Sequence, residues 1–211
     1  MKVRNLNLVF MIMLTATIVS AQTGNVFTIN AGYINPKNIK GGMFFGFMFG
    51  TAIDEAVDIG IGADIFHKSY SENSIVANEE KEGLTTNTYQ TEVEYARTMV
   101  PLNLSVNVKI PTSAYYGYFI RGSLNYELLF SKEKNYEIDK SQTQRFGGFG
   151  WQAAVGLFYH VGSRSTLIAD VCYNSCEVGR DVESSTKGLP TTERVDLSGF
   201  GYRLGVSLDL K

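Results

Sequence analysis

A histidine and a serine separated by one residue, His67 and Ser69, come closest in this sequence to a catalytic pair. Residues two apart on a β-strand point to the same face, so the imidazole would lie beside the hydroxyl. A base next to a hydroxyl activates a serine nucleophile, and Glu92 or Glu94 on a neighbouring strand would supply a carboxylate that orients the base. A pattern this short also arises by chance. We therefore interpret the two residues as polar groups at an interface and predict that the protein is not an enzyme.

Single charged residues that alternate with apolar ones form a second group of candidates. Acids and bases are nearly balanced in this group, and charges taken out of water must pair and hydrogen-bond. We therefore predict a buried ion-pair network made of Asp64, Arg121, Glu127, Asp170 and Arg203. The same alternation adds Asp58, Lys68, Lys109 and Asp209. A selective ion channel, the main alternative, would more naturally be lined by charges of one sign.

The two cysteines, Cys172 and Cys176, lie four residues apart on a predicted strand. Their Cα atoms would then be about 13 Å apart, beyond the reach of a disulfide. A bond would require the strand to bend between them, so we favour two separate thiols. The sequence shows no spacing of metal ligands, and we expect neither a metal nor another cofactor.

The elements that position these residues follow from an alternation of period two. Every odd residue from Phe149 to Val161 is apolar, and so is every even residue from Phe200 to Leu210. Glycine and polar or charged residues, such as Arg203, occupy most positions between them. One face of each strand is thus apolar and the other small or polar, as in a membrane β-barrel. In a soluble barrel the many glycines would face solvent and only weaken the strands.

This alternation restarts along the chain and predicts an all-β fold with eight strands. They are expected at Val26–Ile34, Gly42–Thr51, Ala56–Tyr70, Tyr89–Ile110, Tyr115–Phe130, Phe149–Val161, Thr166–Glu177 and Arg194–Leu210. Short turns alternate with longer polar loops at Asn35–Lys40, Ser71–Asn87, Ser131–Gly148 and Val178–Glu193. Short periplasmic turns and long external loops are typical of outer-membrane barrels. We therefore predict an eight-stranded antiparallel up-and-down transmembrane β-barrel.

Residues 1–21 are expected to be a signal peptide, with residues 22–211 forming the barrel domain. Lys2 and Arg4 precede an apolar stretch too short to span a bilayer, and small residues lead to cleavage between Ala21 and Gln22. Removing those two bases from the 19 Lys and Arg leaves 17 against 21 acids, a formal charge of −4. A nucleic-acid partner is therefore excluded, because it would require a basic surface.

One proline interrupts this pattern. Pro101 lies in the middle of the strand expected at Tyr89–Ile110, where it removes a hydrogen bond of the ladder. We expect a β-bulge there, which would exchange the faces of Val93–Val100 and decide whether Arg97 points into the lumen.

The chain resembles the small eight-stranded outer-membrane barrels of the OmpA and OmpX family over residues 22–211. The resemblance rests on the export signal, the strand count, the unequal connections and the last strand, Gly199–Leu210. One departure is the ending Leu210-Lys211, where many members end in an aromatic residue. The resemblance implies a monomer in the outer membrane of a diderm bacterium, in contact with outer-membrane lipid. The His67-x-Ser69 pair also looks slightly like that of lipid A deacylase barrels, which keeps a lipid-active enzyme as the least favoured alternative.

We expect function to reside in the loops, because the lipid face is constrained by the bilayer and the lumen by its own packing. In the OmpX-like branch, protruding strands are associated with the binding of external proteins. The sequence therefore favours a structural or surface-interaction (adhesin-like) role with a lumen plugged by ion pairs. A narrow channel for small solutes or ions is the alternative.

Overall fold

The computed structural model of the chain describes residues 24–81, 84–136, 140–182 and 191–210. The predicted signal peptide, with its cleavage site between Ala21 and Gln22, lies outside these residues. In the described part of the chain, no helix is long and apolar enough to cross a membrane.

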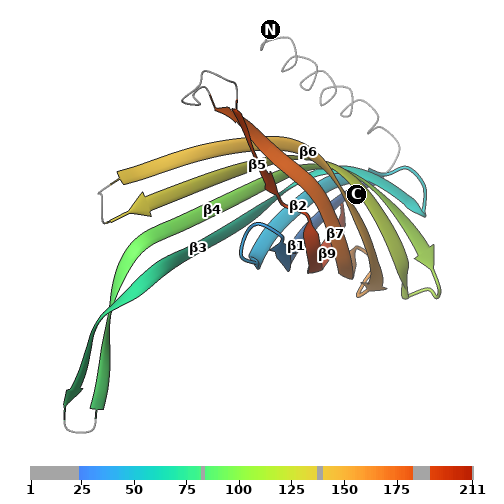
Figure 1. Cartoon of the computed structure of the whole chain (residues 1–211). Helices are drawn as coiled ribbons and strands as arrows, with labels where there is room; N and C mark the ends of the chain where they lie inside the picture. Colours follow the sequence, from blue (N-terminus) through green and yellow to red (C-terminus); the bar gives the residue numbers. More distant parts are fainter. Residues whose placement is uncertain (1–23, 82–83, 137–139, 183–190, 211) are drawn as a thin grey trace.

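The regular structure of the described residues is a single sheet of nine strands that closes on itself (Figure 1). The strands are β1 Asn25–Pro36, β2 Gly42–Ala52, β3 Val57–Lys81, β4 Leu84–Pro111, β5 Tyr116–Asn135, β6 Lys140–His160, β7 Ser165–Val182, β8 Thr191–Asp196 and β9 Gly199–Leu210. Strands β1 to β7 pair in sequence order, and β9 joins β7 to β1, all antiparallel. The predicted fold class is confirmed.

The eighth position in the barrel wall is shared by β8 and β9, where the sequence predicted one strand, Arg194–Leu210. Asp196 at the end of β8 and Gly199 at the start of β9 pair with β7 in one continuous register. The break at Leu197 and Ser198 therefore inserts no extra residue into the wall. Leu197 donates its N–H to a carbonyl of β7, and its side chain is fully buried.

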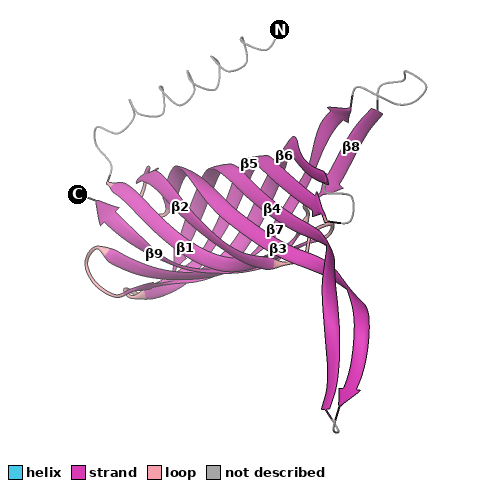
Figure 2. Cartoon of the chain, turned by 90° about the vertical axis from the view of Figure 1, so that its left-hand side faces the viewer, coloured by secondary structure: helices cyan, strands magenta, loops and turns pink. Residues whose placement is uncertain are grey.

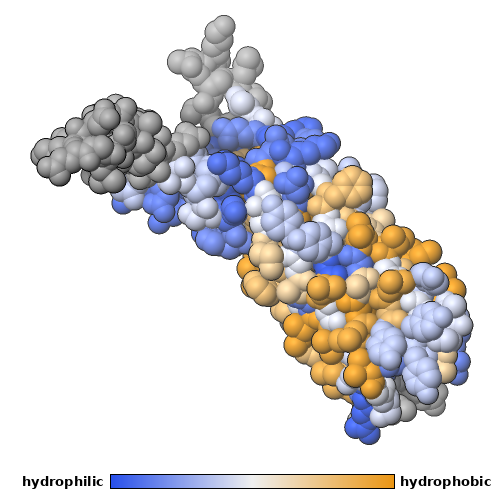
Figure 3. Space-filling model, turned by 90° about the horizontal axis from the view of Figure 1, so that it is seen from below, coloured by the Kyte–Doolittle hydropathy of each residue, from blue (hydrophilic) through white to orange (hydrophobic). Residues whose placement is uncertain are grey.

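The outer surface of the barrel is an apolar belt, visible as the orange region of Figure 3. Side chains along each strand alternate between the lumen and this surface, and Phe149, Leu204 and Phe45 are 83%, 65% and 63% exposed. An outward apolar face is stable only against lipid. The strands therefore span a bilayer.

The two ends of the barrel differ. Short connections join β2 to β3, β4 to β5 and β6 to β7 at one end, which we call the turn end. At the opposite hairpin end, β3 and β4 leave the barrel as a long curved hairpin (Figure 2). Near this end the ring centres of Tyr126 and Phe149 lie 4.9 Å apart and those of Trp151 and Tyr173 lie 5.9 Å apart, both pairs in a tilted arrangement. By the usual rule for these folds, the turn end faces the periplasm.

Two segments predicted as loops are largely strand, and a third is strand in part. Ser71–Asn87 falls mostly within the β3–β4 hairpin, whose pairing continues to Lys81 and Leu84. Most of Ser131–Gly148 pairs between β5 and β6, and part of Val178–Glu193 pairs between β7 and β8. Those loop boundaries were wrong. Polar composition suggested loops, but the Thr and Tyr residues of these segments also have high strand propensity.

The bulge predicted at Pro101 is also wrong. The β3–β4 register is the same before and after the proline, and Pro101 lies opposite Glu127 in an unbroken β4–β5 register. The missing N–H thus removes local pairing without inserting a residue. Arg97 keeps the inward side, with its Nε atom buried. The register shifts of β3–β4 lie farther out, between Glu72 and Asn73 and between Ile75 and Ala77.

Candidate functional site

The centre of the lumen holds an ion-pair cluster around Asp170. Its carboxylate accepts a hydrogen bond from Nε of Arg203 at 2.8 Å and lies 3.7 Å from Nη1 of Arg121. Asp170 and Arg203 are direct neighbours in the β7–β9 register, whereas Arg121 comes from β5. A second nitrogen of Arg203 donates to Oε1 of Gln152 at 2.9 Å. All four side chains are buried, so the cluster ties several strands together inside the barrel.

Asp64 lies on β3 near this cluster and accepts a hydrogen bond from an amide. Nδ2 of Asn103 donates to its carboxylate at 2.7 Å, and Arg203 and Arg121 interact with it electrostatically. Its partner in the β2–β3 register is Gly46. A Cβ atom at Gly46 would overlap the carboxylate, so the glycine makes the room that the acid occupies.

Glu127 departs from the predicted network. It is fully buried, but no ion pair among the described residues includes it. Instead, Nδ2 of Asn174 donates to its Oε1 at 2.7 Å. Arg121 lies six residues away on the same strand, or about 20 Å, which is too far for an ion pair. The other oxygen, Oε2, has no hydrogen-bond partner in the described structure.

Toward the turn end, the lumen contains a separate ion pair. Nζ of Lys109 lies 2.8 Å from the Asp58 carboxylate, to which Asn107 also donates at 3.3 Å. His160 bonds to Thr166 at 2.8 Å. The lumen opens here into a cup of about 520 Å³. This end of the lumen is therefore polar and accessible to water.

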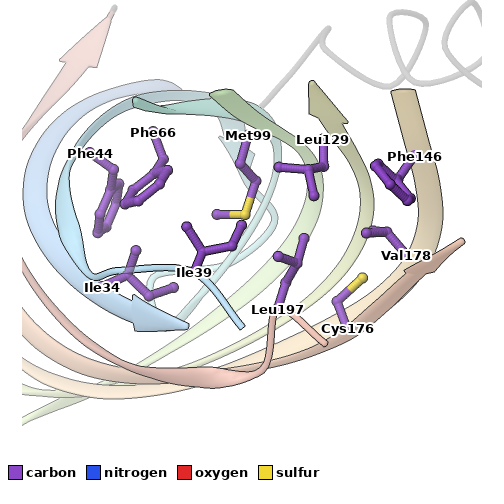
Figure 4. Close-up of a cluster of buried hydrophobic side chains, with 10 residues drawn as sticks. All are labelled: Ile34, Ile39, Phe44, Phe66, Met99, Leu129, Phe146, Cys176, Val178 and Leu197. Atoms are coloured by element: carbon purple, nitrogen blue, oxygen red, sulfur yellow. The ribbon is translucent and has the colours of Figure 1, made fainter. Parts of the chain in front are cut away.

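The hairpin end of the lumen is closed by apolar side chains, which we call the plug (Figure 4). Ile39 enters it from the β1–β2 connection, and Leu197 enters from the break between β8 and β9. The remaining members come from the inward faces of the strands: Ile34, Phe44, Phe66, Met99, Leu129, Phe146, Cys176 and Val178. Sequence reasoning missed the plug. The sequence does contain a signal for the plug, which is a change in the alternation. On the hairpin side of Glu127, inward positions such as Leu129 become apolar.

The cavities inside the lumen are small. One of about 40 Å³ lies by Asp58, one of about 10 Å³ by Arg203 and one of about 20 Å³ by Glu127. A single water molecule needs roughly 10–15 Å³ on this measure. These spaces have room only for isolated water-sized species, and toward the hairpin end the apolar side chains of the plug leave no room for a water column.

No family model matches the sequence, and no curated protein is similar to it at a significant level. Solved structures do match. The outer membrane protein OprG of Pseudomonas aeruginosa aligns with a TM-score of 0.58 at 11% identity, covering 90% of this chain and 98% of that one. The fold is that of the small outer-membrane β-barrels. A major outer membrane protein of Thermus thermophilus aligns with a TM-score of 0.53 at 14% identity, covering 88% of this chain and 99% of that one. Outer membrane protein W of E. coli aligns with a TM-score of 0.50 at 12% identity, covering 90% of this chain and 100% of that one.

This fold and the apolar belt together confirm the predicted location in the outer membrane. At these identities the likeness extends to the fold alone. The predicted resemblance to small eight-stranded outer-membrane barrels is confirmed at that level.

Three residues considered for catalysis, His67, Ser69 and Glu94, lie on the outer surface of this outer-membrane barrel. Nδ1 of His67 is 2.9 Å from Oγ1 of Thr98, while Glu94 accepts a hydrogen bond from Tyr136 at 2.9 Å. The imidazole and the carboxylate thus bond to other residues. The side chain of Glu92 is outside the described structure, and Ser69 is exposed.

The two cysteines of the barrel lie on the inward side of β7 as free, buried thiols. The described residues contain no group of three or more His, Cys, Asp and Glu side chains arranged to hold a metal ion. Any ion in the lumen would therefore depend on amide oxygens as well as carboxylates.

Proposed function

We propose that this outer-membrane barrel is a surface-interaction protein that binds an extended segment of an extracellular protein along the free edge of β3. The observation that carries the proposal is the length of β3. Its last pair with β2 is Phe66 with Phe44, whereas its pairing with β4 continues to Lys81. From Lys68 to Lys81, the side of β3 that faces away from β4 has no neighbouring strand in the described structure.

This edge is about 45 Å long. A strand edge presents unpaired N–H and C=O groups, and an extended peptide can add to it as a further strand. The hairpin projects from the barrel wall in Figures 1 and 2, so the edge is accessible from outside. The segment Ser71–Asn87 contains Glu72, Glu79, Glu80 and Glu82. The charge of these acids favours a basic partner.

The closed lumen supports a binding role over the channel alternative. The ion pairs of Asp170 fill the centre, and the plug fills the hairpin end. Planar-bilayer recordings of the purified protein should accordingly show no stable single-channel currents. Such currents would favour the channel instead.

The binding role is tested with cells that display the full-length protein and an immobilised (Lys-Thr)₄ peptide. Binding is expected for this peptide and not for the same peptide with every backbone amide N-methylated, which has the same charge but cannot donate the hydrogen bonds of an added strand. Replacing residues 73–91 by an Asn-Gly turn should abolish binding, while heat-modifiable gel mobility persists.

The matched control replaces residues 183–190 by the same turn and should leave binding unchanged. Equal binding of the two peptides would show that charge alone attracts them. Binding that survives removal of the β3–β4 hairpin would contradict the proposal.

A further inference from the structure

We propose that the lumen binds one dehydrated hard cation beside Glu127, coordinated by carboxylate and amide oxygens. The site is the cavity of about 20 Å³ at the boundary between the polar lumen and the plug. Its polar wall is formed by Asp64, Asn125, Glu127, Gln152 and Asn174, and its other wall by apolar side chains of the plug.

The first argument is the unpartnered oxygens at this cavity. Glu127 is 0% exposed and Asn125 is 2% exposed. Oε2 of Glu127 and Oδ1 of Asn125 have no hydrogen-bond partner. The further donors near the carboxylate are the thiol of Cys176 and the amide of Asn125. A thiol is a weak donor, and the Asn125 amide already donates to Oδ1 of Asn174 at 3.1 Å. A buried carboxylate oxygen without a strong partner is costly, and a cation at this position removes that cost.

The second argument is the lack of a cation beside Glu127. Four carboxylates of the described residues are buried in the lumen, those of Asp58, Asp64, Glu127 and Asp170. Lys109 pairs with Asp58, Arg121 and Arg203 pair with Asp170, and the two arginines also attract Asp64. Arg97 faces inward as well, but among the described residues it forms no ion pair with Glu127. Glu127 is therefore the buried carboxylate without a cationic partner, and its charged neighbour is another carboxylate, Asp64.

The third argument concerns the type of ion. Carboxylate and amide oxygens are ligands for hard cations, and the described structure has no cluster of His or Cys for a transition metal. Mg²⁺ usually retains several water molecules, for which the cavity is too small. Na⁺ and Ca²⁺ accept irregular oxygen sites. Glu127 is the carboxylate of the cavity wall without a cationic neighbour in the described structure, and its single charge favours Na⁺.

The surroundings explain why an ion would stay in place. The plug seals the cavity on the hairpin side, and the ion-pair cluster lies on the other side. An ion enters while the barrel folds or through fluctuations of the polar lumen. Binding to the folded state alone then stabilises it in proportion to the logarithm of ion concentration.

The test refolds the full-length protein from urea into dodecylphosphocholine micelles, with choline chloride as the only salt. NaCl, KCl, CaCl₂ or MgCl₂ then replaces choline chloride at equal ionic strength. The proposal expects a saturable rise of several degrees in the unfolding temperature with Na⁺ or with Ca²⁺, which distinguishes the two ions. An unfolding temperature that is the same in all five salts overturns it and leaves a water beside a neutral Glu127.

Two variants locate the effect. Glu127→Gln keeps the shape of the side chain but removes the charge, so the cation-dependent rise should vanish. Asp58→Asn alters the ion pair at the turn end and should retain the rise. An undiminished rise in Glu127→Gln would place the ion elsewhere and overturn the proposal.

A third variant, Asn125→Ala, covers the case in which Glu127→Gln does not fold. It removes one neutral ligand and keeps the charge. The cation concentration that gives half of the rise should increase on the order of tenfold. An unchanged concentration would also contradict the site.

Discussion

The strands of this barrel are built in opposite ways inside the bilayer and at the hairpin end. On β5 within the belt, Leu124 faces outward and Arg121 faces the lumen. Farther along the same strand, Leu129 is fully buried inside and Lys132 is exposed outside. The apolar side of the strand thus changes from the outer surface to the interior within a few residues.

The difference follows from the two solvents. In lipid, apolar side chains gain by facing outward, and the polar groups gather in the lumen, where they must pair. Above the bilayer the surrounding medium is water, and apolar side chains gain by facing inward. The plug is therefore the hydrophobic core of a soluble structure, placed on top of a membrane barrel.

The largest effect on the free energy of unfolding is expected from removing an ion pair in the polar part of the lumen. Arg203→Ala removes the 2.8 Å partner of Asp170 and leaves a buried carboxylate with only Arg121 at 3.7 Å. Loss of one partner from a buried ion pair costs about 3–5 kcal/mol. Urea unfolding in micelles measures this loss of stability. In comparison, Arg194→Ala breaks an exposed pair and should cost at most ~1 kcal/mol.

If Arg203→Ala and Arg194→Ala destabilise the protein equally, Asp170 is not a desolvated charge. Arg121→Ala should rank between them, because its distance to Asp170 is longer.

A second substitution compares the plug with the belt. Leu129→Ala should cost about 2–5 kcal/mol, because it leaves a cavity in a packed core. Leu124→Ala removes the same atoms from a side chain that is 66% exposed toward lipid, and lipid can fill the space. Its cost in the same urea titration should be clearly smaller. Equal costs would mean that the plug is loosely packed.

Strand alternation predicted the membrane part of the fold well. The outward apolar rows are regular. The alternate position of a residue along its strand was enough to place Asp64, Arg121, Asp170 and Arg203 on the lumen side. The alternation could not show which lumen residues contact one another. Those contacts depend on the stagger of eight strands, which brings Arg121 of β5 to Asp170 of β7.

The hairpin end was predicted less well. Its polar residues suggested loops, although the backbone remains paired to Lys81 and Leu84. The plug draws single residues from many strands and from two irregular segments, at Ile39 and Leu197. No local window of sequence contains that pattern. Pro101 was expected to force a bulge, but its neighbours hold the register on both sides.

A third prediction concerns space inside the polar half. Gly46→Ala places a methyl group against the Asp64 carboxylate, which must move away from Asn103. Overpacking of this kind costs about 1–3 kcal/mol. Gly122→Ala is the control, since a Cβ there meets nothing within 4 Å. Comparable unfolding midpoints for the two variants would show that Asp64 has room to shift.

The smallest effect is expected where β8 meets β9, outside the bilayer. Ser198 donates hydrogen bonds to the Asp196 carboxylate, its backbone N–H at 2.9 Å, and Lys37 lies 3.2 Å away, so the pKa of Asp196 is held below its usual value. A lowered pKa in the folded state stabilises the protein above the unfolded pKa of about 4, and this contribution is lost as the pH falls below it. The side chain is partly exposed, so the contribution is small. Asp196→Asn should therefore lower the unfolding midpoint slightly at pH 7, and the difference from the unmodified protein should shrink as the pH falls through the lowered pKa of Asp196. A difference that persists unchanged at low pH would assign the effect to hydrogen-bond geometry instead of charge.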